Sequence, residues 1–439
     1  MGERRTTRDW GGALTLAIVP RDEIAPQEIL RRPVMTRLSK IVMLGAMGAA
    51  GSVCAQSSVT LYGTADAGVL SISNTATGKP GYIPSLNATG RTNMYKDGGI
   101  GASNWGVRGK EDLGGGYGAT FQFQGNINTA AGAAGGPNSS SGQSTFNQMA
   151  TVGFSGPFGE VKLGRQMSPM MFAMASTDVR QARYFGSALT ALVGMNSASG
   201  AFIGNNSNVA FGTVYNDSAI VYTTPTWNNF TAHLAYAAGE STGFGKANSQ
   251  QTAALLYASG GLRLSAFYYN GYGNNLPVAT ALYTGATGSA AAGSSAATAA
   301  GFSPTANTNR LMSLGALYKW DAFTVSGAYY KARNPARAVM PGGAASMDMY
   351  TLGAGWQIRP NLNFTSGYYR LKDDTNAGHS ATQLAVGLDY LLSKRTVLYA
   401  QAATIRNKGA NMSLSPVYGT PVAADRNVSA WMLGVRHTF

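Results

Sequence analysis

Cysteine, charge and long apolar runs are all scarce in this chain. Its 439 residues include one cysteine and three histidines, and only 12% of them are charged, about half the share found in soluble domains. The single Cys54 excludes a disulfide framework and a thiolate metal site. No apolar run long enough for a membrane-spanning helix follows residue 55, so the sequence excludes a helical membrane protein.

Glycine and small polar residues take the place of the missing charge, and they alternate with apolar residues. The segment 427–439 carries Trp431 and Leu433 on one face and Arg436 on the other. A strand of this kind that runs to the final residue needs partners along both of its edges. A closed barrel with lipid outside and water inside supplies those partners and explains the alternation.

Sixteen segments repeat this pattern and are bounded by turn residues. They are Ser58–Leu70, Ala102–Glu111, Gly118–Ile127, Thr145–Ser155, Gly159–Gln166, Asp217–Thr224, Phe230–Tyr236, Thr252–Ser259, Leu262–Asn270, Leu311–Trp320, Ala322–Ala332, Met347–Ile358, Leu362–Lys372, Thr382–Leu391, Arg395–Arg406 and Asn427–Phe439. Seven short turns alternate with eight long loops. This order predicts an all-β fold, a transmembrane up-and-down antiparallel β-barrel of 16 strands with short periplasmic turns and long outer loops. A soluble sandwich or propeller also has alternating strands, but neither requires short and long connections in regular succession.

The N-terminal region is typical of an export signal. Basic residues precede a short apolar run over 41–50, and Val53 and Ala55 occupy the small-residue positions of a cleavage site. We therefore divide the chain into an upstream extension of doubtful relevance, a signal peptide and a mature barrel, at 1–34, 35–55 and 56–439.

The charge of the mature chain is basic and dispersed. Without positions 1–55, 25 basic and 14 acidic residues remain, a net charge of +11. The basic residues are scattered singly through the expected strands and loops and form no basic helix. This distribution favours an aqueous lumen, or contact with anionic lipid and lipopolysaccharide, over nucleic-acid binding.

The connection 167–215 is the longest, and it is too apolar for open solvent. It carries seven large apolar residues, which are Met170, Met171, Phe172, Met174, Leu189, Leu192 and Val193. A long apolar loop must pack on something or mark an interaction surface. We expect this third outer loop to fold into the lumen against the barrel wall; an extracellular cap is the alternative.

Several motifs, in order along the mature chain, resemble trimeric general porins of betaproteobacteria. They are the mature start at 56–63, the segments 103–116 and 159–166, the tetrapeptide 222–225, the segment 392–396 and the closing 434–439. The resemblance implies a homotrimer of barrels in the outer membrane of a Gram-negative bacterium. Each barrel would be a water-filled channel, narrowed by its third loop, for passive passage of ions and small hydrophilic solutes.

Selectivity in such a pore depends on the charges at its narrowest part. Of three positions where the resemblance implies arginine on the wall, this chain keeps Arg165 and has Asn104 and Tyr215 at the other two. By simple parity Arg165 faces outward, where mid-membrane arginine is costly, and a bulge at Gly164 would turn it inward.

The remaining candidates at the constriction are charged residues near the same wall and in the third loop. They are Arg108 and Asp66 on strands, and Asp178, Arg180 and Arg183 in the loop. Bases outnumber acids in this set, which predicts a weak to moderate anion preference. Each has a structural alternative: Arg108 near the periplasmic end, Arg180 and Arg183 as loop tethers, and Asp66 as a hydrogen-bonding residue of the wall.

Two rival functions remain. An enzyme inside a barrel needs a histidine beside a serine or an acid, and His233, His379 and His437 have no local motif around them. A substrate-specific channel for sugars or organic acids is the closer alternative, since it would line its lumen with aromatic rings. No motif for a cofactor, a metal or a nucleic acid occurs, and we expect none of these ligands.

Overall fold

The computed structural model describes residues 58–76, 88, 90–135, 145–198, 213–239, 246, 249–272, 308–334 and 344–439. The expected upstream extension and signal peptide lie outside the described residues. The strands are β1 (Ser58–Ser73), β2 (Arg91–Asp97), β3 (Asn104–Gly114), β4 (Tyr117–Asn128), β5 (Ala133–Ala134), β6 (Met149–Gly156), β7 (Gly159–Met167), β8 (Tyr215–Thr223), β9 (Phe230–Ala237), β10 (Gln250–Ser259), β11 (Leu262–Tyr272), β12 (Thr308–Trp320), β13 (Phe323–Arg333), β14 (Ser346–Arg359), β15 (Leu362–Asp373), β16 (Ser380–Leu391), β17 (Thr396–Lys408) and β18 (Val428–Thr438). Two helices, α1 (Pro169–Ser176) and α2 (Ala188–Ala198), lie between β7 and β8. Neither of them, nor any other helix of the described part, is long and apolar enough to cross a membrane.

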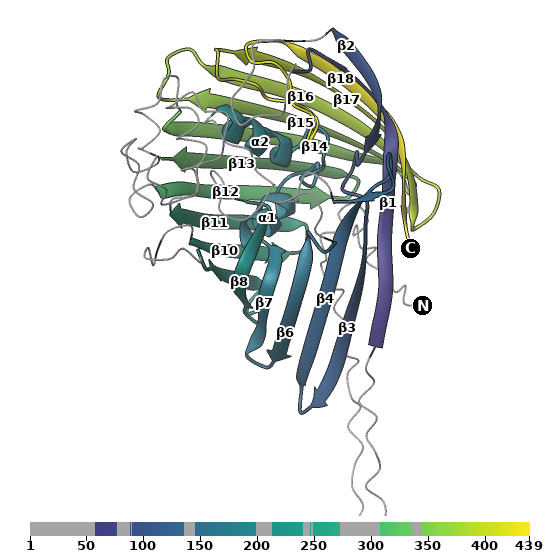
Figure 1. The fold of residues 1–439 in the computed structure, drawn as a ribbon, viewed down its shortest axis with the longest axis vertical. Coiled ribbons are helices and arrows are strands. Elements are labelled where there is room, and N and C mark those ends of the chain that lie inside the picture. The colour runs from purple at the N-terminus through teal and green to yellow at the C-terminus, as the bar shows by residue number, and fades with distance from the viewer. Residues whose placement is uncertain are drawn as a thin grey trace, which may run out of the picture.

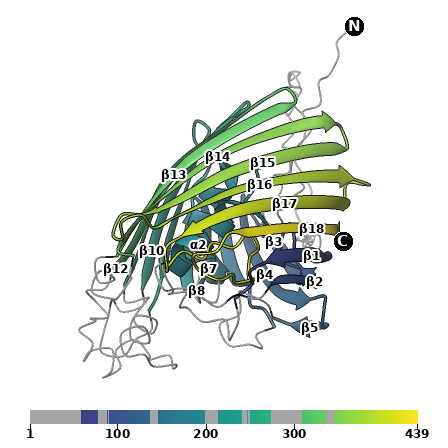
Figure 2. The same ribbon diagram turned by 90° about the horizontal axis from the view of Figure 1, so that it is seen from above.

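The strands form one antiparallel sheet that closes on itself (Figures 1 and 2). Along most of the chain each strand pairs with the next, and the last strand, β18, returns to pair with β1 over Thr64–Ile72. The other edge of β1 pairs with β3 in its first half and with β2 in its second half. Closure leaves the sheet without long free edges, which is the arrangement that a strand-built membrane protein needs.

The count of barrel strands confirms the prediction of sixteen. Of eighteen strands in the sheet, β2 and β3 share one position beside β1, and the two-residue β5 pairs only with the end of β4. The expectation that 71–101 is all loop was wrong, because β1 extends to Ser73 and β2 occupies Arg91–Asp97. The alternation of apolar and polar residues did not indicate β2, because its sequence, RTNMYKD, has almost no apolar face.

Alternation produces two different faces on each strand. On β16, Ala381 and Gln383 point inward with 0% exposure, while Leu384 points outward with 49%. Outward aromatic rings gather near the short-turn ends, where the Phe323 ring lies 6.0 Å from Trp320 and 6.2 Å from Trp356. An apolar band bordered by aromatic rings is the expected exterior of a barrel in lipid.

The outward face of β14 gives a test of lipid contact. Leu352 is 63% exposed and lies two residues from Tyr350 towards the middle of the strand. Replacing Leu352 with Arg should destabilise the barrel by about 2–4 kcal/mol if this depth is hydrocarbon. Thr382→Arg, on the same outward face but near the long-loop end of β16, should cost at most about 1 kcal/mol. Urea unfolding in lipid vesicles measures both, and equal costs for the two variants would contradict a hydrocarbon band at Leu352.

A cluster of charges joins the long-loop ends of β13, β14 and β15. Lys331 contacts Asp348 at 2.8 Å and Asp374 at 2.5 Å, and Lys372 contacts Asp374 at 3.0 Å. Burial opposes the ionisation of Asp374, but hydrogen bonds from the two lysines outweigh burial and lower the pKa of this carboxyl from 3.8 to about 2.

This lowered pKa predicts a pH-dependent contribution to stability. A depressed carboxyl pKa stabilises the folded state above the unfolded pKa of 3.8, and the contribution is lost as the pH falls through about 2. The variant Asp374→Asn should therefore melt at a lower temperature than the parent at pH 6, and the two melting curves should converge towards pH 2. Circular dichroism in detergent follows this difference, and a gap that persists unchanged at pH 2 would rule out the ion cluster as its cause.

Candidate functional site

The segment between β7 and β8 lies against the inner wall of the barrel (Figure 1). Its helix α1 contacts β10 and β11, and α2 contacts β14 and β15. Met170, Met174 and Leu192 are each at most 1% exposed. Of the seven large apolar residues of this segment, all except the half-buried Phe172 are buried.

Small wall residues let the segment approach closely. A Cβ atom at Gly315 of β12 would lie 2.3 Å from Oγ1 of Thr177, and one at Gly387 of β16 would lie 2.8 Å from a guanidinium nitrogen of Arg180. A side chain at Gly315 would collide with Thr177, and one at Gly387 would displace the guanidinium group of Arg180. The glycines are therefore a local signal of where the segment 177–187 crosses the inner face.

Polar contacts fix the path of this crossing. The Thr177 hydroxyl lies 2.9 Å from that of Ser265 on β11, and the Val179 amide donates to the hydroxyl of Ser326 on β13 at 3.2 Å. The segment also reaches the loop before β18, where the ring of Tyr184 lies 4.5 Å from the ring of Tyr418. The segment is thus held both by the barrel wall and by the loop before β18.

The two predicted loop arginines are buried in this contact. Arg180 is 0% exposed, and it donates to the Thr365 hydroxyl at 3.0 Å and to the Gln401 side chain at 2.9 Å. Arg183 is 2% exposed and forms a two-pronged ion pair with Asp389 of β16, at 2.9 and 2.5 Å. Both side chains lie between loop and wall, which is their tethering alternative rather than a position on an open lumen.

Asp178 organises the same turn. One carboxylate oxygen accepts hydrogen bonds from the amides of Ala182 and Ala188, each at 3.0 Å, and the other accepts from the Tyr369 hydroxyl at 3.0 Å. Ala188 is the first residue of α2, so the carboxylate lies at the positive end of that helix. Asp178 is 4% exposed and balances the nearby arginines.

Close to Asn104, side-chain amides line the wall formed by β3, β4 and the residues just before β6. Gln124 donates to the Gln148 side chain at 2.5 Å and accepts from the Tyr62 hydroxyl at 2.8 Å. Asn126 and Asn147 form a second amide pair at 2.9 Å. Amides thus line the part of the lumen that faces the start of the loop segment.

Asn104 and Tyr215 lie together at this wall. They border one small cavity of about 50 Å³, whose lining also includes Gln124, Gln148 and Arg436. Asn104 is 4% exposed and Tyr215 is 5% exposed. Neither residue brings charge to the cavity, and Arg436 is the one charged residue among its described lining residues.

Arg165 lies beside the same group, and β7 has the irregularity that an inward Arg165 requires. The register of β7 against β8 shifts between Gly164 and Gln166, and Gly164 has a φ of +110°. The Arg165 guanidinium lies 5.6 Å from the centre of the Tyr215 ring and forms an ion pair with Asp217. The structure therefore brings Arg165, Asn104 and Tyr215 to one region of the wall and balances the arginine with a carboxylate.

Arg108 is separate from this group. Its guanidinium lies 5.2 Å from the centre of the Tyr62 ring, on the strand β3 below Asn104. No ion pair of Arg108 occurs among the described residues, so it is a cation with an aromatic neighbour rather than a carboxylate.

Asp66 and Arg436 meet at the seam where the barrel closes. They are direct cross-strand partners in the β1–β18 pairing, with exposures of 0% and 4%. The Asp66 carboxylate accepts from the amides of Gly99, Ile100 and Gly101 at 2.9–3.0 Å and from the Tyr399 hydroxyl at 2.7 Å. This carboxylate therefore fixes the connection between β2 and β3.

Arg436 was not singled out from the sequence, although its position was readable there. The alternation of the last strand places it opposite Trp431 and Leu433, on the inner face. Its importance appears only when β18 is placed beside β1 and Asp66 becomes its partner.

Inward tyrosines are numerous but covered. Tyr269, Tyr330, Tyr369 and Tyr399 are at most 3% exposed. Their rings lie under the loop segment or in hydrogen bonds with the wall, so they form no exposed aromatic track of the kind that a sugar channel uses.

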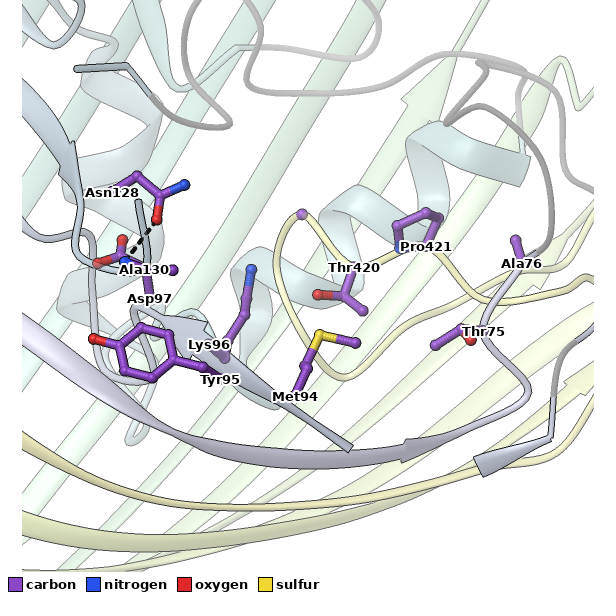
Figure 3. Close-up of a pocket in the computed structure, with 11 residues that line it drawn as sticks. Thr75, Ala76, Met94, Tyr95, Lys96, Asp97, Asn128, Ala130, Thr420 and Pro421 are labelled. Atoms are coloured by element: carbon purple, nitrogen blue, oxygen red, sulfur yellow. Dashed lines mark hydrogen bonds between the residues drawn. The ribbon is translucent and has the colours of Figure 1, made fainter. Parts of the chain in front are cut away.

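A larger open pocket of about 400 Å³ lies at the long-loop end, between β2, the turn after β4 and the loop before β18 (Figure 3). Lys96, Asp97, Asn128 and Thr420 are among its lining residues. Asp97 accepts hydrogen bonds from the amide and hydroxyl of Thr129, which fastens the β4 turn to β2. This pocket shares no lining residue with the small cavity beside Asn104 and Tyr215.

Two histidines of the described part have polar neighbours. His233 lies 3.0 Å from the hydroxyl of Thr223, and His379 lies 4.0 Å from Asp373. No group of three or more metal-binding side chains occurs within the described ranges.

A closed barrel with an apolar exterior, a polar interior and a segment folded against its inner wall is a channel of the outer-membrane class. Comparison with known proteins identifies the family: the chain belongs to the Gram-negative porins, whose family profile matches residues 42–410. It is thus an outer-membrane channel protein and not an enzyme.

Individual relatives agree with this assignment. Outer membrane porin protein 32 of Delftia acidovorans is 30% identical over 403 residues, covering 91% of this chain and 99% of the relative. The solved anion-selective porin from Comamonas acidovorans superposes with a TM-score of 0.65 at 24% identity, covering 88% of this chain and 100% of that one. OmpT of Vibrio cholerae superposes with a TM-score of 0.54 at 13% identity and shares the fold, covering 87% of this chain and 98% of its own.

The ion pair between Arg183 and Asp389 offers a test of how the loop is held. Asp389→Ala leaves the buried Arg183 without its partner, which costs about 3–5 kcal/mol for a pair of this kind. Since the pair joins the loop to the wall, the loop should detach before the barrel unfolds. Single-channel recordings should then show larger and noisier current steps than the parent protein.

The matched control removes a carboxylate whose hydrogen bond lies within the loop before β18 and not in the contact between the segment 167–198 and the wall. Asp425→Ala changes an exposed acid in the loop before β18, whose carboxylate accepts from the Gly409 amide. It should leave the current steps as in the parent. Quiet, parent-like steps from Asp389→Ala would show that this ion pair does not hold the segment.

Proposed function

We propose that the protein is a general diffusion porin through which ions and small hydrophilic solutes pass without a dedicated binding site, with a weak to moderate anion preference. The channel is narrowest between the segment 167–198 and the side-chain amides of β3, β4 and the residues just before β6. The short turns lie in the periplasm and the long loops outside the cell.

One observation supports the weakness of the selectivity: the charges near the constriction occur as opposite pairs. Arg183 pairs with Asp389, Arg165 with Asp217 and Arg436 lies opposite Asp66. Opposite charges a few ångströms apart largely cancel at the distance of a passing ion. Arg108 remains without a carboxylate among the described residues, and this excess gives the preference its positive sign.

The relatives support the same sign. A solved structure that shares the fold is described as an anion-selective porin. In this chain the amides Asn104 and Gln148 and the phenol Tyr215 lie near two cations, Arg436 and Arg165, and each of these cations has a carboxylate opposite it. A wall with so little charge favours anions only slightly.

We also propose that the barrel works as a homotrimer surrounded by outer-membrane lipid and lipopolysaccharide. Structural neighbours include a trimer form of OmpT of Vibrio cholerae. The exposed apolar side chains on the outside of the barrel are suited to both kinds of contact, with a second copy and with lipid tails.

A substrate-specific channel for sugars or organic acids is less well supported. Such a channel needs aromatic faces or charged groups that touch the solute, and the inward tyrosines here are buried under the loop. Current that saturates or is blocked by sugars or organic acids would favour this alternative, whereas a linear current–voltage relation favours the general pore.

Reversal potentials in a salt gradient across a planar bilayer test the charge argument. The parent should show a small anion preference. Asn104→Arg adds one charge at this wall. A unit charge about 8 Å from a passing ion in water favours an anion by about 0.5 kcal/mol and disfavours a cation by the same amount, so the permeability ratio should change roughly fivefold.

The matched control places the same charge outside the lumen. Thr382→Arg lies on the outward face of β16 and should leave the reversal potential unchanged. Clear cation selectivity of the parent protein, or equal responses of the two variants, would contradict the assignment of the narrow wall.

A further inference from the structure

The outward face of β12–β17 carries basic residues where these strands approach the long loops. Six of them are exposed. Lys372 forms an ion pair with Asp374, and we call the other five the outer basic band: Arg310, Arg333, Arg370, Arg406 and Lys408. Each shares the outward parity of exposed apolar residues on its own or a neighbouring strand, as Arg310 does with Met312 and Leu314. The band therefore lies on the exterior of the barrel and not in the lumen.

Strand register places the band directly above the apolar belt. One cross-strand row contains Leu352, Tyr368 and Leu384. The next row, two residues or about 7 Å further along the strands, contains Tyr350, Arg370, Thr382 and Arg406. Beyond it lies the row of Lys331, Asp348, Lys372 and Lys408. This order from leucine through tyrosine and arginine to lysine is the order of depth from lipid tail to lipid headgroup.

The arginines of the band lack carboxylate partners. Asp348 and Asp374 are both held by Lys331, and Asp374 also by Lys372. No ion pair of Arg310, Arg333 or Arg406 occurs in the part of the chain that the structure describes. The loops next to Arg310 and Arg333 cannot supply one to these two residues, because Asp321, at the opposite end of β12, is the only acid in the whole stretch 271–345.

One pair within the band is unfavourable without an added anion. Arg310 and Arg333 are direct partners across β12 and β13, and like charges in directly opposed positions destabilise a sheet. A phosphate between them reverses the sign of the interaction, since the planar guanidinium group binds phosphate through two parallel hydrogen bonds.

From these contacts we infer that the outer basic band is a binding site for the phosphate groups of an outer-leaflet lipid, with its acyl chains on the leucine and tyrosine rows below. The inference rests on the proposed orientation, in which the long loops lie outside the cell. It adds a specific lipid site on one side of the barrel to a channel whose conduction does not depend on it.

Binding to purified protein in detergent tests the site, with bisphosphorylated lipid A as the probe and its dephosphorylated form as the comparison. The parent should bind the phosphorylated probe and not the dephosphorylated one. Arg333→Gln/Arg370→Gln/Arg406→Gln should weaken binding roughly a hundredfold, the factor expected for three basic contacts to an anionic surface. Native mass spectrometry counts the bound lipids in each case.

The matched control removes three charges from the other end of the barrel. Arg359→Gln/Lys394→Gln/Arg395→Gln changes exposed residues near the short turns and should bind like the parent. A lysine version of the triple variant, Arg333→Lys/Arg370→Lys/Arg406→Lys, keeps the charge and should lose only part of the affinity. Parent-like binding by the glutamine variant, equal binding of the two probes, or equal losses from both ends would overturn the site.

Conductance separates this inference from the proposed function. All three triple variants should give parent-like current steps in a planar bilayer, which also shows that they fold. A parent protein that binds the lipid but conducts no ions would defeat the proposed channel and leave the lipid site standing. A conducting parent with no lipid binding would do the reverse.

Discussion

A backbone amide in hydrocarbon has no water to bind, and this constraint organises the whole molecule. Each strand must be paired along both edges, so the sheet has to close, and the pairing of β18 with β1 completes it. Closure in turn creates a wide interior lumen. A ring of sixteen strands is too wide for wall side chains to fill, and a bare lumen would pass large solutes freely.

The segment between β7 and β8 resolves this problem with ordinary packing. Its methionines and leucines are buried against the inner wall, and the wall supplies glycines where the backbone comes closest. Its charged residues Arg180 and Arg183 hold it there through hydrogen bonds to Gln401 and Asp389 of the wall. The wall near the start of this segment carries neutral amides, and the charged residues of the segment hold it against the barrel.

The sequence predicted those parts of the fold that depend on neighbours along the chain. Two-residue alternation and turn spacing are local, so the sixteen strands and the inward packing segment could be read directly. Strand β2 was missed because its residues are polar on both faces, and its pairing with β1 is what makes it a strand. The function of Arg183 could not be read either, since Asp389 lies 206 positions away and becomes its neighbour only in the closed barrel. Arg436 is the intermediate case, with a face that alternation indicated and a partner that only the seam revealed.

The carboxylate of Asp66 has a consequence for assembly. It accepts hydrogen bonds from the backbone amides of 99–101 and from the hydroxyl of Tyr399 on β17. It also lies opposite Arg436 on β18. Without the last two strands this carboxylate would keep its three backbone hydrogen bonds but would lack the Tyr399 hydroxyl and the opposing guanidinium of Arg436. Closing the barrel at this seam therefore completes the contacts of a buried carboxylate, and a barrel open at the seam would leave that carboxylate without two of its partners.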